Sequence, residues 1–142
     1  MNIVIASDHG GFELKEKLKT YYAHKGIELL DVGTHSEESC DYPDIARKAC
    51  EKILNNQASL GILICGTGIG ISIAANRFKG IRAALLYSDD VARLAKEHNN
   101  ANVLVFGGRT MSFEEVVSRL EIFEKTSFGG ERHQRRIDKL DA

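Results

Sequence analysis

Residues 60–78 read LGILICGTGIGISIAANRF, an apolar run that ends in a thiol and is followed by three alternating glycines. A short apolar run that stops at glycines is typical of a buried strand, and the stretch at 69–77 has the composition of a short helix. A strand, a glycine loop and a helix in this order form one half of a βα unit of a parallel sheet. The rest of the chain can be arranged around this unit.

Short apolar runs alternate with longer amphipathic stretches along the whole sequence. Strands are predicted at 3–6, 27–32, 60–65, 81–87 and 103–106. Because these runs are apolar almost throughout, both faces of the sheet should be covered by helices. The pattern predicts an α/β fold, a three-layer α/β/α sandwich of the Rossmann-like kind with a five-stranded parallel sheet.

Amphipathic stretches and capping residues locate the helices. Helices are predicted at 11–24, 42–55, 69–77, 88–98 and 112–125, with a last helix that begins at about residue 130. In the first helix Lys15 is predicted to face solvent with the other charged residues. Ser88 and Ser112 are expected N-caps, and Ser112 should form a capping box with Glu115. With no repeat or linker, residues 1–142 are predicted to form a single domain.

Composition limits the class of protein. The chain has 142 residues, 43% of them apolar, and a formal net charge of −1, so neither nucleic acid nor a membrane surface is an expected partner. The N-terminal residues lack the pattern of a signal peptide, and no stretch approaches the roughly 18 to 20 apolar residues of a membrane span, so a cytoplasmic location is expected. Cys40, Cys50 and Cys65 lack metal-site spacing, which predicts reduced thiols and no metal.

Polar residues follow most of the predicted strands, where ligands bind in parallel sheets. Asp8 and His9 come after the first strand, Tyr42 lies beyond the second, and Arg109 follows the fifth. Asp8 and His9 could form a simple turn, and Tyr42 could be a packed aromatic residue at a helix entry. Their shared position at one edge of the sheet favours a functional role.

The glycine loop leaves two ligand classes open. Gly66, Gly68 and Gly70 let backbone amides approach either a phosphate or the oxyanion of an enediolate. A dinucleotide fingerprint would need a third glycine where Ile71 stands, so a nucleotide-binding module stays only as an alternative. Cys65 is either a buried small hydrophobic residue or a thiolate stabilised by the helix that follows it.

Further candidates lie near two helix ends. His98 and Asn99 end a predicted helix, where a histidine also suits the helix dipole. Arg132 and Arg136 are four residues apart on the last helix and therefore share a face. That face is either solvated surface or a phosphate clamp, since arginine binds phosphate oxygens in a bidentate manner.

The segments SDHGGFELK, CDYPD, GILICGTGIGISIAANRFKGIRAAL, HNNANVLVFGGR and GGERHQRRI together closely resemble the type B ribose-5-phosphate isomerases. These form one family with the galactose-6-phosphate isomerase subunits and allose-6-phosphate isomerase. The resemblance implies an α/β/α sandwich, a homodimer or dimer of dimers with active sites at the subunit interface, and no metal or organic cofactor. It implies interconversion of ribose 5-phosphate and ribulose 5-phosphate, with the two six-carbon sugar phosphates as alternative substrates.

The resemblance also implies roles for individual residues. Cys65 matches the catalytic base and Thr67 a neighbouring hydroxyl, while His98, with Asp8 close by, matches the ring-opening group. The remaining matches bind substrate: Asn99 and the loop amides of Gly66, Gly68, Ile69 and Gly70 for the enediolate, Tyr42 for the sugar, His9, Arg132 and Arg136 for the phosphate, and Arg109 as an arginine that some members take from the partner subunit. One branch of the family uses a glutamate at the position of Ile71, so this chain falls in the cysteine branch.

Overall fold

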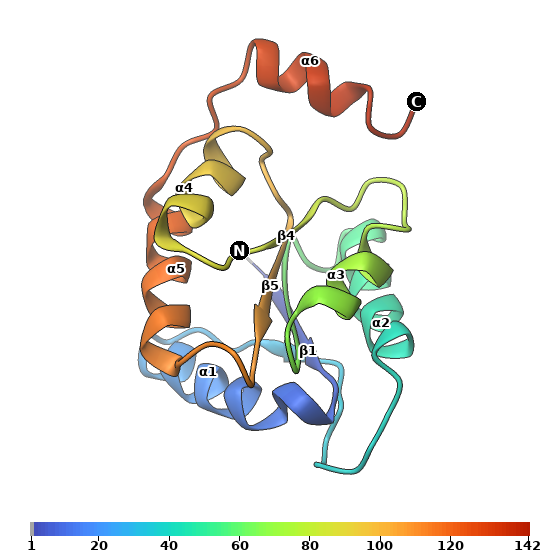
Figure 1. Ribbon diagram of the computed structural model, residues 1–142, viewed down its shortest axis with the longest axis vertical. Coiled ribbons are helices and arrows are strands. Elements are labelled where there is room, and N and C mark those ends of the chain that lie inside the picture. The colour runs from blue at the N-terminus through green and yellow to red at the C-terminus, as the bar shows by residue number, and fades with distance from the viewer. Residues whose placement is uncertain (1) are drawn as a thin grey trace.

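A computed structural model describes residues 2–142, in which five parallel strands form one sheet in the order β2-β1-β3-β5-β4 (Figure 1). The strands are β1 (Ile3–Ser7), β2 (Leu30–Asp31), β3 (Leu60–Cys65), β4 (Ala83–Leu85) and β5 (Val103–Gly107). The strand that carries the thiol, β3, pairs with β1 on one side and β5 on the other. The glycine loop therefore starts from the centre of the sheet.

Helices cover both faces of the sheet, which confirms the predicted fold class. The helices are η1 (His9–Gly11), α1 (Phe12–His24), α2 (Tyr42–Leu54), α3 (Ile69–Ala75), α4 (Asp89–Glu97), α5 (Phe113–Lys125) and α6 (Arg132–Asp138). Figure 1 shows α1, α4 and α5 on one side of the sheet, α2 and α3 on the other, and α6 at one end of the molecule. Within residues 2–142 no helix is long and apolar enough to cross a membrane.

Alternate residues of each central strand enter different cores. Ile62 packs with apolar side chains of α1, α4 and α5, whereas Leu63 packs with those of α2 and α3, and both are fully buried. Two buried faces explain why the strand sequences are apolar without alternation. Cys50, on α2, is buried in the second of these cores.

The two edge strands are shorter than the sequence predicts. Instead of 27–32 and 81–87, the strands cover only Leu30–Asp31 and Ala83–Leu85. Ile27 lies just after the end of α1, and its amide donates to the carbonyl of Tyr22 in that helix at 2.9 Å. Ile81 lies before the pairing with β5 begins, although it is buried in a core. An apolar run thus reports burial in both cases, but strand pairing covers only part of it.

The predicted helices and caps are confirmed to within about two residues of their ends. Ser88 accepts a hydrogen bond from the amide of Val91 at 3.1 Å. Ser112 and Glu115 form the predicted capping box, with hydrogen bonds of 2.8 and 3.1 Å.

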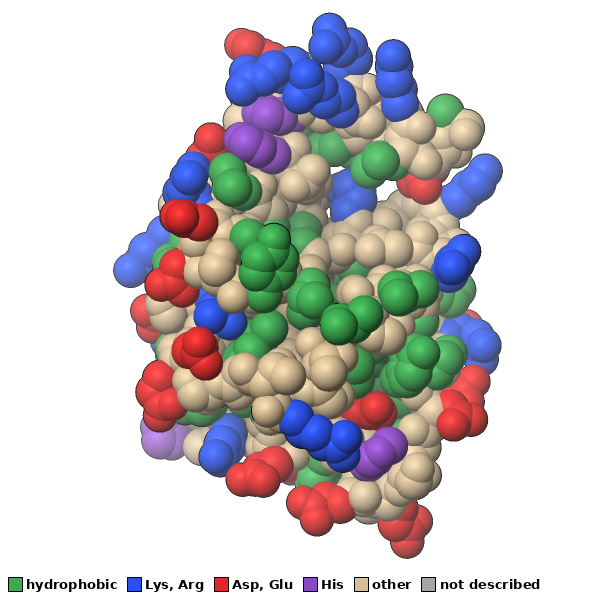
Figure 2. All heavy atoms as spheres, viewed as in Figure 1, with side chains coloured by type: hydrophobic (Ala, Val, Ile, Leu, Met, Phe, Trp, Pro, Cys, Tyr) green, Lys and Arg blue, Asp and Glu red, His purple; other side chains and the backbone are tan. Residues whose placement is uncertain are grey.

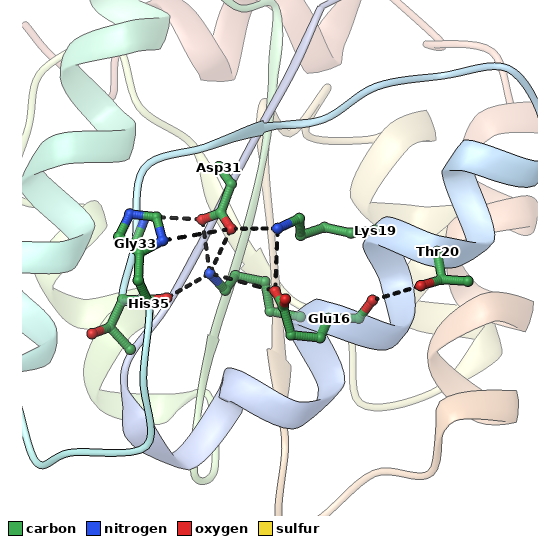
Figure 3. Close-up of polar contacts among 8 residues, drawn as sticks. Glu16, Lys19, Thr20, Asp31, Gly33 and His35 are labelled. Atoms are coloured by element: carbon green, nitrogen blue, oxygen red, sulfur yellow. Dashed lines mark hydrogen bonds and ion pairs between the residues drawn. The ribbon is translucent and has the colours of Figure 1, made fainter.

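Lys15 is wrongly predicted to face solvent, because its side chain is fully buried. Its Nζ donates to both carboxylate oxygens of Asp31, at 2.7 and 2.8 Å, and to the carbonyl of Thr34 at 2.6 Å. Asp31 also accepts from Lys19 and from the amide of Gly33, both at 2.9 Å (Figure 3). The end of β2 supplies Asp31 and the segment that follows supplies the carbonyl of Thr34, so the lysine can bury its charge.

Candidate active site

Cys65 ends β3 and lies against the first amides of the glycine loop. Its Sγ accepts a hydrogen bond from the amide of Gly68 at 3.2 Å, and the residue is only 5% exposed. An amide hydrogen aimed at the sulfur stabilises negative charge there. The side-chain oxygen of Thr67, in turn, accepts from the amide of Ile69 at 3.2 Å.

Gly68 is required for this arrangement. Its φ is +84°, a left-handed conformation, and a Cβ at this position would lie 2.5 Å from Cδ1 of Leu85 and 3.1 Å from the carbonyl of Phe106. Any side chain would therefore meet both backbone strain and a steric clash. The glycine allows the chain to turn directly from the buried strand into α3.

Loops from β1 and β5 reach the glycine loop from both sides. The amide of Asp8 donates to the carbonyl of Ile64 at 3.1 Å, and the amide of Arg109 donates to the carbonyl of Gly66 at 2.9 Å. The Arg109 guanidinium also lies beside Gly66, because a Cβ on that glycine would be 3.3 Å from Nη1. The buried Asp8 carboxylate accepts from the amide of Gly10 at 2.9 Å.

Two predicted site residues from η1 and α2 lie at the same edge. The ring of Tyr42 packs against Gly70, since a Cβ there would be 2.7 Å from the tyrosine Cζ. His9 accepts a hydrogen bond at Nδ1 from the amide of Cys40 at 3.2 Å, which assigns its proton to Nε2. His9 and Arg109 line one hollow of about 500 Å³. We call this set the carboxyl-end half-site, which consists of Asp8, His9, Tyr42, Cys65, Arg109 and the loop from Gly66 to Gly70.

His98 and Asn99 lie at the opposite end of the sheet. They precede β5, whereas Arg109 follows it. Because a parallel strand advances about 3.3 Å per residue, the five residues of β5 separate the two groups by roughly 16 Å. Within a single chain, Asp8 and His98 therefore do not meet.

A second histidine accompanies His98 at this end. The rings of His98 and His133 are stacked, with centroids 4.3 Å apart and an angle of 15° between their planes. Burial, together with the positive charges of Arg132, His98 and Arg136, lowers the pKa of His133. The lowered pKa favours the neutral ring of His133 beside these positive charges.

The arginines of α6 complete this second group. Arg132 and Arg136 both lie on α6, and Figure 2 shows lysine and arginine side chains gathered there above two adjacent histidines. The amide of Gly129, which precedes α6, donates to the carbonyl of Glu97 at the end of α4 at 2.9 Å. We call this set the amino-end half-site, which consists of His98, Asn99, Arg132, His133 and Arg136.

Sequence reasoning missed the contact between His98 and His133. No spacing rule joins two residues so far apart in the chain. Four basic residues within GGERHQRRI were the available signal, but they do not indicate which element α6 packs against.

In residues 2–142 no three His, Cys, Asp or Glu side chains are grouped so that they could hold a metal ion.

The fold and the thiol-bearing loop define the class, an α/β sandwich protein in which a thiol meets a loop amide at the carboxyl edge of the sheet. The chain belongs to the ribose/galactose isomerase family, whose model matches residues 3–140.

Individual relatives agree with this assignment. The chain is 39% identical over 140 residues to ribose-5-phosphate isomerase B of Escherichia coli K12, covering 99% of this chain and 94% of that one. The crystal structure of a ribose 5-phosphate isomerase from Thermotoga maritima matches with a TM-score of 0.96 and 58% identity, over 99% of this chain and 97% of that one. Ribose-5-phosphate isomerase B from Mycoplasma genitalium, solved with bound ribulose-5-phosphate, matches with a TM-score of 0.92 and 44% identity, covering 98% and 93%. The resemblance noted in the sequence is thereby confirmed.

Proposed function

We propose that this chain is an aldose–ketose isomerase that interconverts D-ribose 5-phosphate and D-ribulose 5-phosphate. The observation that carries the proposal is the contact between Cys65 and the amide of Gly68 at the mouth of the glycine loop. A relative of 44% identity binds ribulose-5-phosphate, which supports a five-carbon substrate. Family membership favours the isomerase over the nucleotide-binding module that the loop alone left open.

Cys65 is the proposed base of the isomerisation step. As a thiolate it takes the proton from C2 of the open-chain aldose, which leaves a cis-enediolate, and returns that proton to C1 while the hydroxyl proton on O2 passes to O1, which gives the ketose. The amides from Gly66 to Gly70 and the hydroxyl of Thr67 stabilise the charge on the two oxygens. Loss of one such donor typically raises the barrier by about 3 kcal/mol.

His98 is the proposed ring-opening group. The substrate is mostly a closed furanose, so a proton must leave the anomeric hydroxyl and another must reach the ring oxygen before C2 can react. A histidine suits this exchange because it gains and loses a proton near neutral pH. The side-chain amide of Asn99 then adds a donor for the enediolate.

We infer that each active site combines half-sites from two subunits. The half-sites of one chain lie roughly 16 Å apart along β5, whereas His98 and Cys65 must act on neighbouring atoms of one sugar. In a twofold dimer, the carboxyl-end half-site of one subunit can face the amino-end half-site of the other. Arg132 and Arg136 would then bind the phosphate together with His9 and Arg109 across the interface.

An exposed apolar patch supports this association. Ile69 and Ile73 on α3 are 54% and 52% exposed, and Tyr87 after β4 is 65% exposed. Figure 2 shows hydrophobic side chains gathered in the middle of the face that also carries the two histidines. Apolar side chains in such a group favour contact with another protein surface, and a second copy of the chain fits the proposed composite site. A homodimer, or a pair of such dimers, is the proposed assembly.

The proposed reaction uses neither a metal nor an organic cofactor, and it belongs to the non-oxidative pentose phosphate pathway, with the cytoplasm as the proposed location. The test is a direct assay. Purified protein should convert ribose 5-phosphate to ribulose 5-phosphate, and Cys65→Ala should abolish conversion while the fold is retained. A folded wild-type protein without this activity would overturn the proposal.

A six-carbon substrate is the second candidate, because the family also includes galactose isomerases. Ribose 5-phosphate and allose 6-phosphate should be compared at equal concentration. A tenfold preference corresponds to only about 1.4 kcal/mol in the transition state, so small changes in the pocket can decide it. We expect kcat/KM to be higher with ribose 5-phosphate than with allose 6-phosphate.

A further inference from the structure

Arg82 connects the segment before β4 to the residues that follow α4. Its Nε donates to the carbonyls of Asn99 and Asn100 at 3.1 and 3.2 Å, and its Nη2 donates to the carbonyl of Asn100 at 2.9 Å. These carbonyls belong to the turn that directly follows His98. The guanidinium therefore holds the backbone that carries His98 and Asn99, two residues of the amino-end half-site.

The backbone of Arg82 strengthens the same connection. Its amide donates to Oδ1 of Asn102 at 2.7 Å, and its carbonyl accepts from the amides of Asn102 and Val103 at 3.1 and 3.3 Å. The side-chain amide of Asn102 donates to the carbonyl of Gly80 at 2.8 Å. The base of the Arg82 side chain is thus fixed, so its guanidinium is aimed from a rigid support.

The turn after α4 depends on Arg82 for its remaining carbonyls. Backbone amides already bind the carbonyls of the last turn of the helix, namely those of Leu94, Ala95, Lys96 and Glu97. The carbonyls of Asn99 and Asn100 lie beyond the helix end, and Asn100 has a left-handed φ of +42°. The planar fork of an arginine can bind two adjacent carbonyls, and its positive charge suits the C-terminal end of a helix.

Packing alone does not hold this turn. A cavity of about 370 Å³ lies between the residues that follow α6 and the body of the molecule, and both Arg82 and Asn99 line it together with Leu140. Figure 2 shows the corresponding hollow beneath α6. Asn99 is exposed there, so loss of the Arg82 bonds would free the turn without opening the core.

We propose that Arg82 is a positioning residue for ring opening, which holds the turn after α4 so that His98 and Asn99 face the substrate. This rests on the proposed function, because His98 is the proposed ring-opening group. Arg82 acts through the carbonyls of its own chain. Its loss should therefore lower kcat for ribose 5-phosphate and leave KM nearly unchanged.

Ring opening can be measured separately from isomerisation in a Cys65→Ala background. Without the base at C2, repeated opening and closing of the furanose still exchanges the α and β anomers of ribose 5-phosphate. In each opening the bond from C1 to the ring oxygen breaks, the anomeric hydroxyl loses a proton and the ring oxygen gains one. Exchange spectroscopy by NMR on the anomeric protons reports the rate.

The Cys65→Ala protein should accelerate anomer exchange above the rate in buffer. Adding Arg82→Lys should reduce this acceleration about tenfold or more, because a small misplacement of a reacting group has large effects on rate. Arg77→Lys is the matched control, since Arg77 is exposed and the described residues give its side chain no hydrogen bond. It should leave the exchange rate unchanged.

Chemical rescue separates positioning from general destabilisation. In a Cys65→Ala, Arg82→Ala protein, millimolar guanidinium should restore part of the anomer exchange, because it can occupy the vacated place between the carbonyls. Unchanged exchange in the Arg82→Lys protein would overturn the role of Arg82 while leaving the ring-opening role of His98 intact. If Cys65→Ala alone does not accelerate exchange but His98→Asn still abolishes turnover, the ring-opening role and the Arg82 proposal both fail.

Discussion

The carboxyl-end half-site is built on backbone hydrogen bonds at the centre of the sheet, whereas the amino-end half-site depends on side chains at helix ends. Around Cys65, the amides of Asp8, Gly108 and Arg109 all donate to carbonyls at or beyond the end of β3. Around His98, beyond the backbone bonds that end α4 itself, the contacts with other segments are a stacked ring, the Arg82 guanidinium and one backbone bond to the segment before α6. The backbone position of the first half-site should therefore withstand most side-chain changes except at required glycines, while the position of the second should respond to single side chains.

The largest expected effect concerns the buried ion pair between Lys15 and Asp31 beneath the carboxyl-end half-site. Asp31→Asn leaves the buried ammonium of Lys15 with only the more distant carboxylate of Glu16, at 3.9 Å, and breaking a buried pair in this way costs about 3–5 kcal/mol of stability. Urea denaturation should show this loss. Glu13→Gln is the control, because it removes only the exposed pair with Lys17 and should change stability by about 1 kcal/mol or less. An Asp31→Asn protein as stable as the control would contradict the account.

Acid should act on the same network. Burial raises the pKa of Asp31, but hydrogen bonds from Lys15, Lys19 and Gly33 outweigh it and leave the pKa below its ordinary value of 3.8. A carboxyl group with a lowered pKa stabilises the fold at pH values above its ordinary pKa. This contribution is lost as the pH falls through the folded-state pKa. The wild-type protein should therefore lose stability below about pH 4, and Asp31→Asn should lack this part of the acid response.

The next effect breaks the backbone frame of the carboxyl-end half-site itself. Gly68→Ala adds a Cβ that clashes with Leu85 and forces a left-handed φ on alanine. The substitution should displace the loop and lower kcat about a hundredfold, because losing one preorganised hydrogen-bond donor typically lowers kcat by this factor. Gly26→Ala has a similar φ of +76° but open space around the new Cβ, so it should lose a little stability and keep full activity. Equal activity of the two variants would refute the requirement at Gly68.

A smaller effect is expected at the amino-end half-site. His133→Ala removes the ring that stacks on His98 and should lower kcat about tenfold, because an aromatic pair contributes about 0.5–1.5 kcal/mol. His133→Phe keeps a flat ring without a proton to exchange and should retain most of the activity. If both variants show wild-type kcat, the stack does not orient His98.

The different construction of the half-sites also explains what the sequence could predict. Parallel strands end at one edge of a sheet, so locating β1, β3 and β5 was enough to bring Asp8, Cys65 and Arg109 together. No such rule applies to His98 or α6, because their positions depend on tertiary contacts between distant segments. The roles of individual residues came from the resemblance and not from spacing.

The wrong prediction for Lys15 has a related physical reason. A lysine on an amphipathic helix usually reaches solvent, and only the pairing of β2 with β1 and the course of the chain after it place Asp31 and the carbonyl of Thr34 against Lys15. The short edge strands likewise reflect neighbours, since a terminal strand pairs on one side only. Periodicity located the apolar segments, but pairing partners decided where each strand ends.

The measurement that tests the composite site most directly mixes two inactive proteins. Cys65→Ala subunits keep an intact amino-end half-site, and His98→Asn subunits keep an intact carboxyl-end half-site. After unfolding and refolding together in equal amounts, half of the dimers should contain one of each, and each of these should carry one complete site. The mixture should recover about one quarter of the wild-type activity, as expected for random pairing in a twofold dimer. A mixture as inactive as either protein alone would rule out a site shared between subunits.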